Sequence, residues 1–317
     1  MRVLVTGAAG FIGSRIAHRL LTAGAEVVAL DAVTDYYDPA IKRRRTAALT
    51  RAGGSRCTVV EADLTRPGWE HHLDGVDAIL HQAGQPGVRS SWSSGFEGYV
   101  HHNVLATQRL LEVVREHLDA GGRLQRLVYA SSSSVYGDAL TLPTPETALP
   151  APRSPYGVTK LAAEHLCGTY ARSFGLPIVA LRYFTVYGGG QRPDMALHRI
   201  IAASRTGAPF PRFGDGEQRR DLTHVDDVAA ANLAALDPQL PAGTVCNIAG
   251  GSQTTLNELL ARVEAATGRS VPIEAHPEQA GDVRRTGADT SQAQRLLGWR
   301  PTVDLDAGIA EQIAYDG

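Results

Sequence analysis

The sequence contains few cysteines, no excess of charge of one sign and no long apolar run, and each absence excludes a class of protein. Cysteine occurs only as Cys57, Cys167 and Cys246. An odd, widely spaced set argues against a disulfide framework or a zinc site and fits a reducing compartment, so we expect a cytoplasmic protein. The formal net charge is -2, which predicts no nucleic-acid partner and no general membrane surface.

Neither a membrane span nor a signal peptide is expected. No apolar run is long enough to cross a bilayer, and the N-terminus starts a strand directly rather than a charged leader and an apolar core. Apolar residues make up 43% and charged residues 20% of the 317 positions. These proportions are typical of a globular protein long enough for two lobes.

Apolar, β-branched runs alternate with helix-like segments throughout residues 1–182. This alternation predicts one doubly wound α/β domain with a parallel sheet. After residue 182 the chain becomes rich in glycine and arginine loops, and we interpret residues 183–317 as mainly a smaller lobe over the strand ends. A strand expected at 244–248 is predicted to return to the first domain.

A glycine loop directly follows the first predicted strand. Residues 2–6 (RVLVT) lead into GAAGFIG, and a helical pattern follows. The loop carries Gly7, Gly10, Phe11, Ile12 and Gly13. Glycines between a strand and a helix let the backbone approach a pyrophosphate at the helix N-terminus, which indicates dinucleotide binding rather than an ordinary tight turn.

Further cofactor contacts are expected at the ends of the next strands. Asp31 ends the second strand, where a carboxylate binds ribose hydroxyls and repels a 2'-phosphate, so NAD is favoured over NADP. The small residues of Gln82-Ala83-Gly84 let a cofactor lie close to the backbone. Asn103 lies inside a helical pattern over 95–118 and is also predicted to contact the cofactor.

The basic run and the adjacent histidine pairs are not predicted to form binding sites. The run at 42–45 (KRRR) is interpreted as a solvated helix face, because no aromatic residues interleave it. The pairs at 71–72 and 101–102 are adjacent histidines, which do not share a helix face. We therefore predict no metal site and locally hydrogen-bonded or solvated histidines.

Tyr156 and Lys160 stand four residues apart on a predicted helix, so both side chains lie on one face. A nearby ammonium lowers the pKa of a phenol, which would make Tyr156 a base for a hydroxyl proton. The alternative is a half-buried tyrosine beside a solvated lysine. The serines at 131–134 end the preceding strand, where ligands of parallel sheets bind, and they favour the catalytic interpretation.

The motifs occur in the order found in the extended short-chain dehydrogenase/reductase family, and the sequence resembles its nucleotide-sugar epimerases and dehydratases. They are TGAAGFIG, SSSSVYG, YGVTK, RYFTVYG, RRDLTHVDDVA and GDVRRTGAD. Within the family, HQAGQPGVRSSW and GGQRPDM most resemble the bacterial UDP-glucuronate 4-epimerases. The resemblance covers essentially the whole chain and implies a Rossmann fold with NAD bound tightly and regenerated at each turnover.

The resemblance also implies residue roles. Tyr156 would be the base, Lys160 would tune it and hold the nicotinamide ribose, and Ser132 would be the catalytic hydroxyl. Asp63 and Leu64 would join the NAD contacts. Thr185 and Arg192 would recognise the sugar carboxylate. Ser133 and Ser134 would line the sugar pocket, and Arg220 and Arg284 would contact the diphosphate or the uridine of the nucleotide. Apart from the resemblance, Arg89 is the one strong anion donor in the loop at 87–92 and is a further candidate for the carboxylate.

Three features separate activities within the family. The 4,6-dehydratases carry an Asp-Glu pair where this chain has Ser133-Ser134, and the decarboxylases carry a glutamate in the same loop. The glucuronate epimerases often have Pro and a polar or basic residue where this chain has Gly189-Gly190. The favoured activity is C4 epimerisation of UDP-glucuronate. A decarboxylase, a UDP-glucose 4-epimerase and a silent NAD-sensing protein are the alternatives, and the resemblance implies a homodimer.

Overall fold

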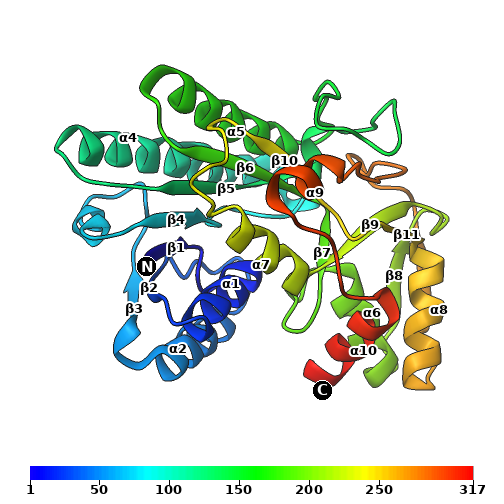
Figure 1. Cartoon of the computed structure of the whole chain (residues 1–317). Coiled ribbons are helices and arrows are strands. Elements are labelled where there is room, and N and C mark those ends of the chain that lie inside the picture. Colours follow the sequence, from blue (N-terminus) through cyan, green and yellow to red (C-terminus); the bar gives the residue numbers. More distant parts are fainter. Residues whose placement is uncertain (317) are drawn as a thin grey trace.

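The computed structural model describes residues 1–316 as an α/β fold built around one parallel sheet (Figure 1). Its strands lie in the order β10-β6-β5-β4-β1-β2-β3, and every neighbouring pair is parallel. They are β1 (Arg2–Thr6), β2 (Glu26–Asp31), β3 (Cys57–Glu61), β4 (Ala78–His81), β5 (Arg126–Ser132), β6 (Ile178–Tyr183) and β10 (Val245–Ile248). The order winds outward from β1 in both directions, which confirms the predicted doubly wound sheet.

Helices cover both faces of this sheet (Figure 1). On one side pack α1 (Phe11–Thr22), α2 (Pro39–Gly53) and α7 (Val225–Ala234), and on the other α4 (Ala106–Asp119) and α5 (Pro155–Phe174). Successive strand residues face opposite sides, so Val3 and Val5 join the first core and Leu4 joins the second. Within residues 1–316, no helix is both long and apolar enough to cross a membrane.

Part of the chain beyond β6 forms a smaller lobe with its own core. One sheet has the order β11-β9-β7 and a second pairs β12 with β8. The strands are β7 (Thr185–Tyr187), β8 (Phe210–Phe213), β9 (Arg219–His224), β11 (Ser252–Thr255) and β12 (Ile273–His276). The helices are α6 (Ala196–Thr206), α8 (Leu256–Thr267) and α10 (Leu305–Tyr315). Helix α9 (Ser291–Leu297) packs instead on the core of the large sheet, against β10. Strand β10 leaves this lobe and pairs with β6 of the large sheet.

The helical segment predicted over 95–118 is interrupted in the structure. It consists of α3 (Phe96–Tyr99), a π-helical turn (Val100–Leu105) and then α4. Asn103 lies in the π turn, where its amide oxygen accepts from the backbone N–H of Gln85 at 2.7 Å and its amide donates to Thr159 at 3.0 Å. A π turn inserts an extra residue into a helix, and here it points a buried amide at the loop after β4.

Candidate active site

A cavity of about 360 Å³ lies over the carboxyl ends of the parallel strands. The predicted catalytic residues Ser132, Tyr156 and Lys160 line it, together with Thr185 and Arg192. So do all the residues predicted to contact the cofactor, which are Gly7, Gly10, Phe11, Ile12, Gly13, Asp31, Asp63, Leu64, Gln82, Ala83, Gly84 and Asn103. The fold therefore gathers into one cavity side chains that lie far apart in the sequence.

The glycine loop at this cavity has no room for side chains. A Cβ on Gly13 would lie 2.1 Å from the carbonyl oxygen of Gly7, and a Cβ on Gly7, whose φ is +68°, would lie 2.7 Å from the backbone nitrogen of Ala83. Helix α1 then begins without a side-chain cap on Gly10. Backbone N–H groups at an uncapped helix N-terminus bind anions, so the loop fits the pyrophosphate of a dinucleotide.

Asp31 holds the backbone beside this loop. Its carboxylate accepts hydrogen bonds from the backbone N–H groups of Ala9 at 3.0 Å and Val33 at 2.7 Å. At the second contact Val33 has a φ of 46°, which is unusual for a β-branched residue. The carboxylate is thereby anchored at the cavity wall, where its remaining lone pairs can accept from ribose hydroxyls.

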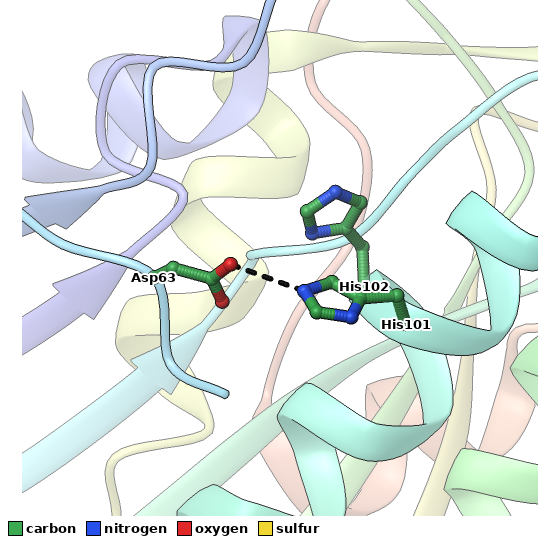
Figure 2. Close-up of side chains that lie close together, drawn as sticks. All are labelled: Asp63, His101 and His102. Atoms are coloured by element: carbon green, nitrogen blue, oxygen red, sulfur yellow. Dashed lines mark hydrogen bonds and ion pairs between the residues drawn. The ribbon is translucent and has the colours of Figure 1, made fainter. Parts of the chain in front are cut away.

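Asp63 is bound by His101, one of the histidines predicted to be solvated or locally hydrogen-bonded. Nε2 of His101 lies 3.1 Å from its carboxylate (Figure 2). The Thr65 hydroxyl donates to the same carboxylate at 2.8 Å. Burial opposes ionisation of Asp63, but the hydrogen bonds from His101 and Thr65 outweigh it and hold its pKa at about 2. His102 lines the cavity, and its ligand atom lies close enough to those of Asp63 and His101 for a metal ion. The contact with His101 helps to keep Asp63 ionised, so its carboxylate is available at the cavity wall as a hydrogen-bond acceptor.

The local sequence sets the start of the helix that carries Tyr156 and Lys160. The Ser154 hydroxyl caps α5 by accepting from the Gly157 N–H at 3.1 Å, and Pro155 occupies the first turn. Lys160 is buried with an exposed fraction of 6%. Its ammonium lies 4.6 Å from the centre of the Tyr129 ring, a cation–π contact.

The electrostatics of this pair differ from the expectation. Burial raises the pKa of the Tyr156 phenol, and the opposing contributions come from the hydrogen bond with Ser132 and the charge of Arg192. Burial therefore outweighs the contributions that lower the pKa of Tyr156, and Lys160 is not among the groups that lower it here. Burial also lowers the pKa of Lys160 to about 8, so the lysine is itself close to giving up its proton.

A buried ion pair holds α5 against the sheet behind the catalytic residues. Glu164, two helical turns after Tyr156 and one after Lys160, accepts from Arg182 of β6 at 2.6 and 3.0 Å. Both side chains have exposed fractions of 6%. The Ser131 hydroxyl donates to the same carboxylate at 2.6 Å. This network ties α5 to the ends of β5 and β6, and so fixes the distance between Tyr156 and the serine loop.

A second cavity, of about 610 Å³, adjoins the first, and Thr185 and Arg192 line both. Arg192 donates to both carboxylate oxygens of Asp194 at 2.9 Å. Arg89 and Arg220 line the second cavity, and Arg89 pairs with Asp282 at 3.1 Å. The two cavities together present a buried phenol, several hydroxyls and arginines along one continuous path.

Arg284 and the run at 42–45 lie in surroundings that differ from those expected. Arg284 lines neither cavity; it is largely exposed and forms a bidentate pair with Asp215 at 2.8 Å. The run at 42–45 is not simply a solvated face. Lys42 is buried and donates to Thr34 at 2.8 Å, and Arg45 donates to backbone oxygens of Ala9 and Gly190. The sequence gives the positions of these cations, but only the fold shows which residues contact them.

Other cavity residues were not selected from the sequence. Tyr36 lines both cavities, and its hydroxyl lies 3.1 Å from that of Ser90. Asp194, the partner of Arg192, lines the second cavity. The two tyrosines of the polar segment TDYYDP, soon after Asp31, are the available signal for Tyr36. Asp194 lies only two residues from Arg192, a spacing that permits the pair but does not require it.

Comparisons with known proteins agree with this site. The sequence model of the NAD dependent epimerase/dehydratase family matches residues 3–249. An uncharacterized UDP-glucose epimerase of Bacillus subtilis is 41% identical over 99% of this chain and 98% of its own length. A UDP-glucuronate 4-epimerase of Thermodesulfobacterium geofontis is 34% identical over 98% of this chain and 95% of its own.

A solved structure is similar along its whole length. The UDP-glucuronic acid 4-epimerase of Bacillus cereus, in complex with UDP-glucuronic acid and NAD, superimposes with a TM-score of 0.94 at 39% identity. The match covers 100% of this chain and 99% of that one. The glycine loop, the paired tyrosine and lysine, the family match and the full-length relatives all agree, and the chain belongs to the NAD dependent epimerase/dehydratase family.

Proposed function

We propose that the protein interconverts UDP-glucuronate and UDP-galacturonate by epimerising C4 of the sugar. The observation that carries this proposal is the position of Arg192. Its guanidinium lines the same cavity as Tyr156 and is close enough for its charge to lower the pKa of that phenol. A planar cation beside the catalytic base suits a substrate with a carboxylate next to its reacting carbon.

Tyr156 is proposed to remove the proton of the C4 hydroxyl and later to return one. Ser132, which lines the same cavity, provides a second hydroxyl that can hold the same sugar oxygen. Bound NAD⁺ would supply the acceptor, and later the donor, of the C4 hydride. Lys160 lines the cavity, and its Nζ lies next to the wall formed by Gly84, 3.8 Å from where a Cβ on that glycine would stand. We propose that this ammonium holds ribose hydroxyls of the cofactor.

The oxidised sugar has a ketone at C4 and a carboxylate on C5, so it is a β-keto acid that loses carbon dioxide readily. Loss is fastest when the C5–C6 bond aligns with the ketone π system. An epimerase must therefore hold the carboxylate out of that alignment in both sugar orientations. We assign this restraint to Arg192 and Thr185, with Arg89 beside the adjoining cavity as a further donor.

The chain is proposed to divide this work between its two parts. Residues 1–182 would hold NAD through the glycine loop, Asp31 and the strand ends, and residues 183–317 would mainly hold the nucleotide sugar. Ser133 and Ser134 line the first cavity beside Tyr156 and would contact the sugar, and Arg220 lines the second and would contact the UDP moiety. Arg284, which lies outside both cavities, is not assigned a contact.

A UDP-glucose 4-epimerase is the second candidate. The Bacillus subtilis relative carries that description. In addition, Asp194 already neutralises Arg192 through two hydrogen bonds of 2.9 Å, which reduces the attraction for a second carboxylate. A neutral sugar would then fill the same space without needing the guanidinium.

We also propose a homodimer in the cytoplasm. Leu105, Val158 and Phe174 are apolar and exposed near the outer surface of α4 and α5, with exposed fractions of 49%, 49% and 56%. This helix pair lies uncovered on one side of the molecule (Figure 1). Three cysteines without disulfides fit a reducing compartment. Light scattering of the purified protein tests the dimer, and a monomer at micromolar concentration would refute it.

The test of the function is incubation with UDP-glucuronate, without added NAD, followed by chromatography and mass spectrometry. A new peak of unchanged mass that co-elutes with UDP-galacturonate supports the proposal and a retained cofactor. A product lighter by carbon dioxide identifies a decarboxylase instead. Conversion of UDP-glucose alone in a parallel reaction supports the second candidate. Failure to convert either sugar, in protein shown to contain NAD, would leave a non-catalytic NAD-binding protein.

A further inference from the structure

The segment that carries Arg192 is bonded to two helices that are distant in the sequence. This segment, residues 188–192, is called the glycine segment below, because it begins with Gly188-Gly189-Gly190. From one side, Arg45 of α2 donates to the carbonyl oxygen of Gly190 at 2.5 Å. The same guanidinium donates to the carbonyl oxygen of Ala9 in the cofactor loop at 3.2 Å. Arg45 therefore links the glycine loop of α1 to the glycine segment.

The last turn of α10 holds the glycine segment from the other side. Gln312 is fully buried, accepts from the Gly188 N–H at 2.9 Å and donates to the side chain of Gln191 at 3.0 Å. Asp316, directly after the helix, accepts from the Gly190 N–H at 3.3 Å. Side chains at the end of α10 thus accept hydrogen bonds from two backbone N–H groups of the glycine segment.

The glycines make room for this contact. A Cβ on Gly189 would lie 2.8 Å from the Tyr315 ring, and Gly190 has a φ of +77° with the same ring 3.2 Å from an added Cβ. Larger residues at these positions would push Tyr315 away or change the path of the segment. The departure from the family pattern at Gly189-Gly190 thus coincides with an aromatic residue of α10 packed against the backbone.

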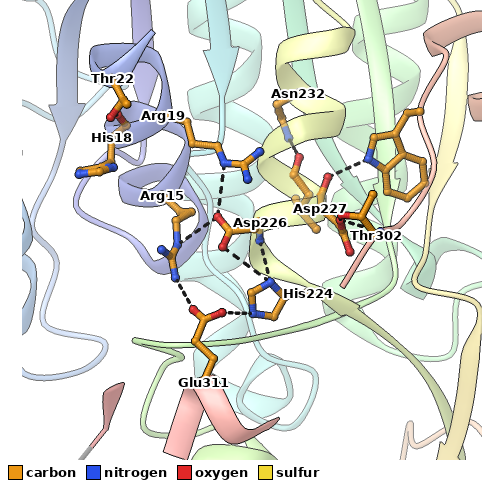
Figure 3. Close-up of polar contacts among 12 residues, drawn as sticks. Arg15, His18, Arg19, Thr22, His224, Asp226, Asp227, Asn232, Thr302 and Glu311 are labelled. Carbon is orange, nitrogen blue, oxygen red and sulfur yellow. Dashed lines mark hydrogen bonds and ion pairs between the residues drawn. The ribbon is translucent and has the colours of Figure 1, made fainter. Parts of the chain in front are cut away.

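Helix α10 is itself fixed to the cofactor-binding half. Glu311 lies 3.2 Å from Arg15 of α1 and 3.4 Å from Nε2 of the buried His224 (Figure 3). Arg15 also lies 3.6 Å from Asp226, at the start of α7. Figure 3 shows Glu311 reaching from α10 toward this cluster. These contacts connect α10 to α1 and to the start of α7.

We propose that Gln312, Asp316 and Arg45 are positioning residues that set the place of the Arg192 guanidinium, and so restrain the sugar carboxylate. This inference rests on the proposed function. The glycine segment has three consecutive glycines and little stiffness of its own, so its position depends on these bonds. When the segment shifts, the C5–C6 bond can align with the ketone. That bond then breaks, its electron pair passes to the C4 ketone as an enolate, C5 takes up a proton and carbon dioxide leaves.

The test compares Asp316→Ala and Gln312→Ala with the matched control Asp306→Ala. Asp306 is an exposed carboxylate in the first turn of the same helix, where it pairs with Arg262. Each variant is incubated with UDP-glucuronate, and the ratio of lighter product to epimerised product is measured. The affinities for UDP-glucuronate and for UDP, which lacks the carboxylate, are measured by calorimetry.

We expect Asp316→Ala and Gln312→Ala to raise the ratio of lighter to epimerised product. Their affinity for UDP-glucuronate should fall roughly tenfold, as expected for misplacing one charge-assisted hydrogen bond. Affinity for UDP and the amount of retained NAD should stay as in the wild type, and Asp306→Ala should change nothing. Arg45→Ala should also raise the ratio of lighter to epimerised product. Its control is Arg44→Ala, which removes an exposed charge from the same helix.

A purely structural role predicts a different result. Variants of Asp316 and Gln312 that fold, retain NAD and give the wild-type product ratio and affinities would overturn the inference. If Gln312→Ala does not fold, the less buried Asp316 carries the test alone. A wild-type protein that does not convert UDP-glucuronate would overturn the proposed function and this inference together. An active wild type with unaffected variants would overturn the inference only.

Discussion

Replacing Lys160 by methionine should stabilise the nucleotide-free protein while it stops catalysis. The lysine is buried beside the Tyr129 ring, and burial lowers its pKa from 10.5 to about 8. Each unit of pKa corresponds to about 1.4 kcal/mol. At pH 7 the ammonium is charged in the folded and unfolded states alike, so its burial costs the folded state about 3 kcal/mol. Methionine has a similar length and no charge to bury.

The stability difference between Lys160→Met and the wild type should decrease as the pH rises. Between about pH 8 and 10.5 the unfolded chain keeps the Lys160 proton and the folded protein has lost it. The unfolded state binds more protons in this window, so the stability of the wild type rises with pH. The advantage of Lys160→Met should therefore fall from about 3 kcal/mol at pH 7 to roughly 1 kcal/mol at pH 9.5.

Urea unfolding of both proteins at these two pH values measures the difference. NAD must first be removed from both, because a ligand that binds only the folded state adds its own stabilisation. The chain has only two lysines, Lys42 and Lys160. Lysine-selective carbon labelling therefore gives a simple NMR spectrum, in which the pKa of Lys160 can be titrated directly. A variant less stable than the wild type at pH 7, or a difference that does not change with pH, would refute the reasoning.

Three further substitutions test other parts of the site. Tyr156→Phe should lower kcat by about 10²–10⁴-fold, since it removes the proton acceptor, while calorimetric affinity for UDP-glucuronate stays within about twofold. Glu164→Ala leaves the Arg182 charge buried without its partner and should lower the free energy of unfolding by about 3–5 kcal/mol, measured in urea; a loss below about 1 kcal/mol would mean that the pair is solvated. Asp31→Asn removes the negative charge at the cofactor ribose and should raise the affinity for NADP relative to NAD, measured by fluorescence titration; an unchanged preference would place the selectivity elsewhere.

The parallel sheet and the cofactor loop could be predicted because their signals are local. Buried parallel strands are short apolar runs, and a glycine loop between a strand and a helix needs no distant residue to be recognised. Tyr156 and Lys160 were found for the same reason, since a spacing of four residues on a helix already places two side chains on one face. The interruption at Val100–Leu105 was missed, because a π turn has the same apolar pattern as the helix around it.

Burial and long-range contact were decided by the tertiary structure alone. The sequence shows cations at 42–45, but only the fold brings Arg45 to Gly190 and buries Lys42 against Thr34. The pKa of Tyr156 depends on how much water the surrounding elements exclude, which no spacing within α5 reveals. By itself the sequence determined which chemistry is present and which strand ends carry it. How Arg192 is held, between α2 and α10, depends on packing between segments more than a hundred residues apart, and local patterns carry no information about such contacts.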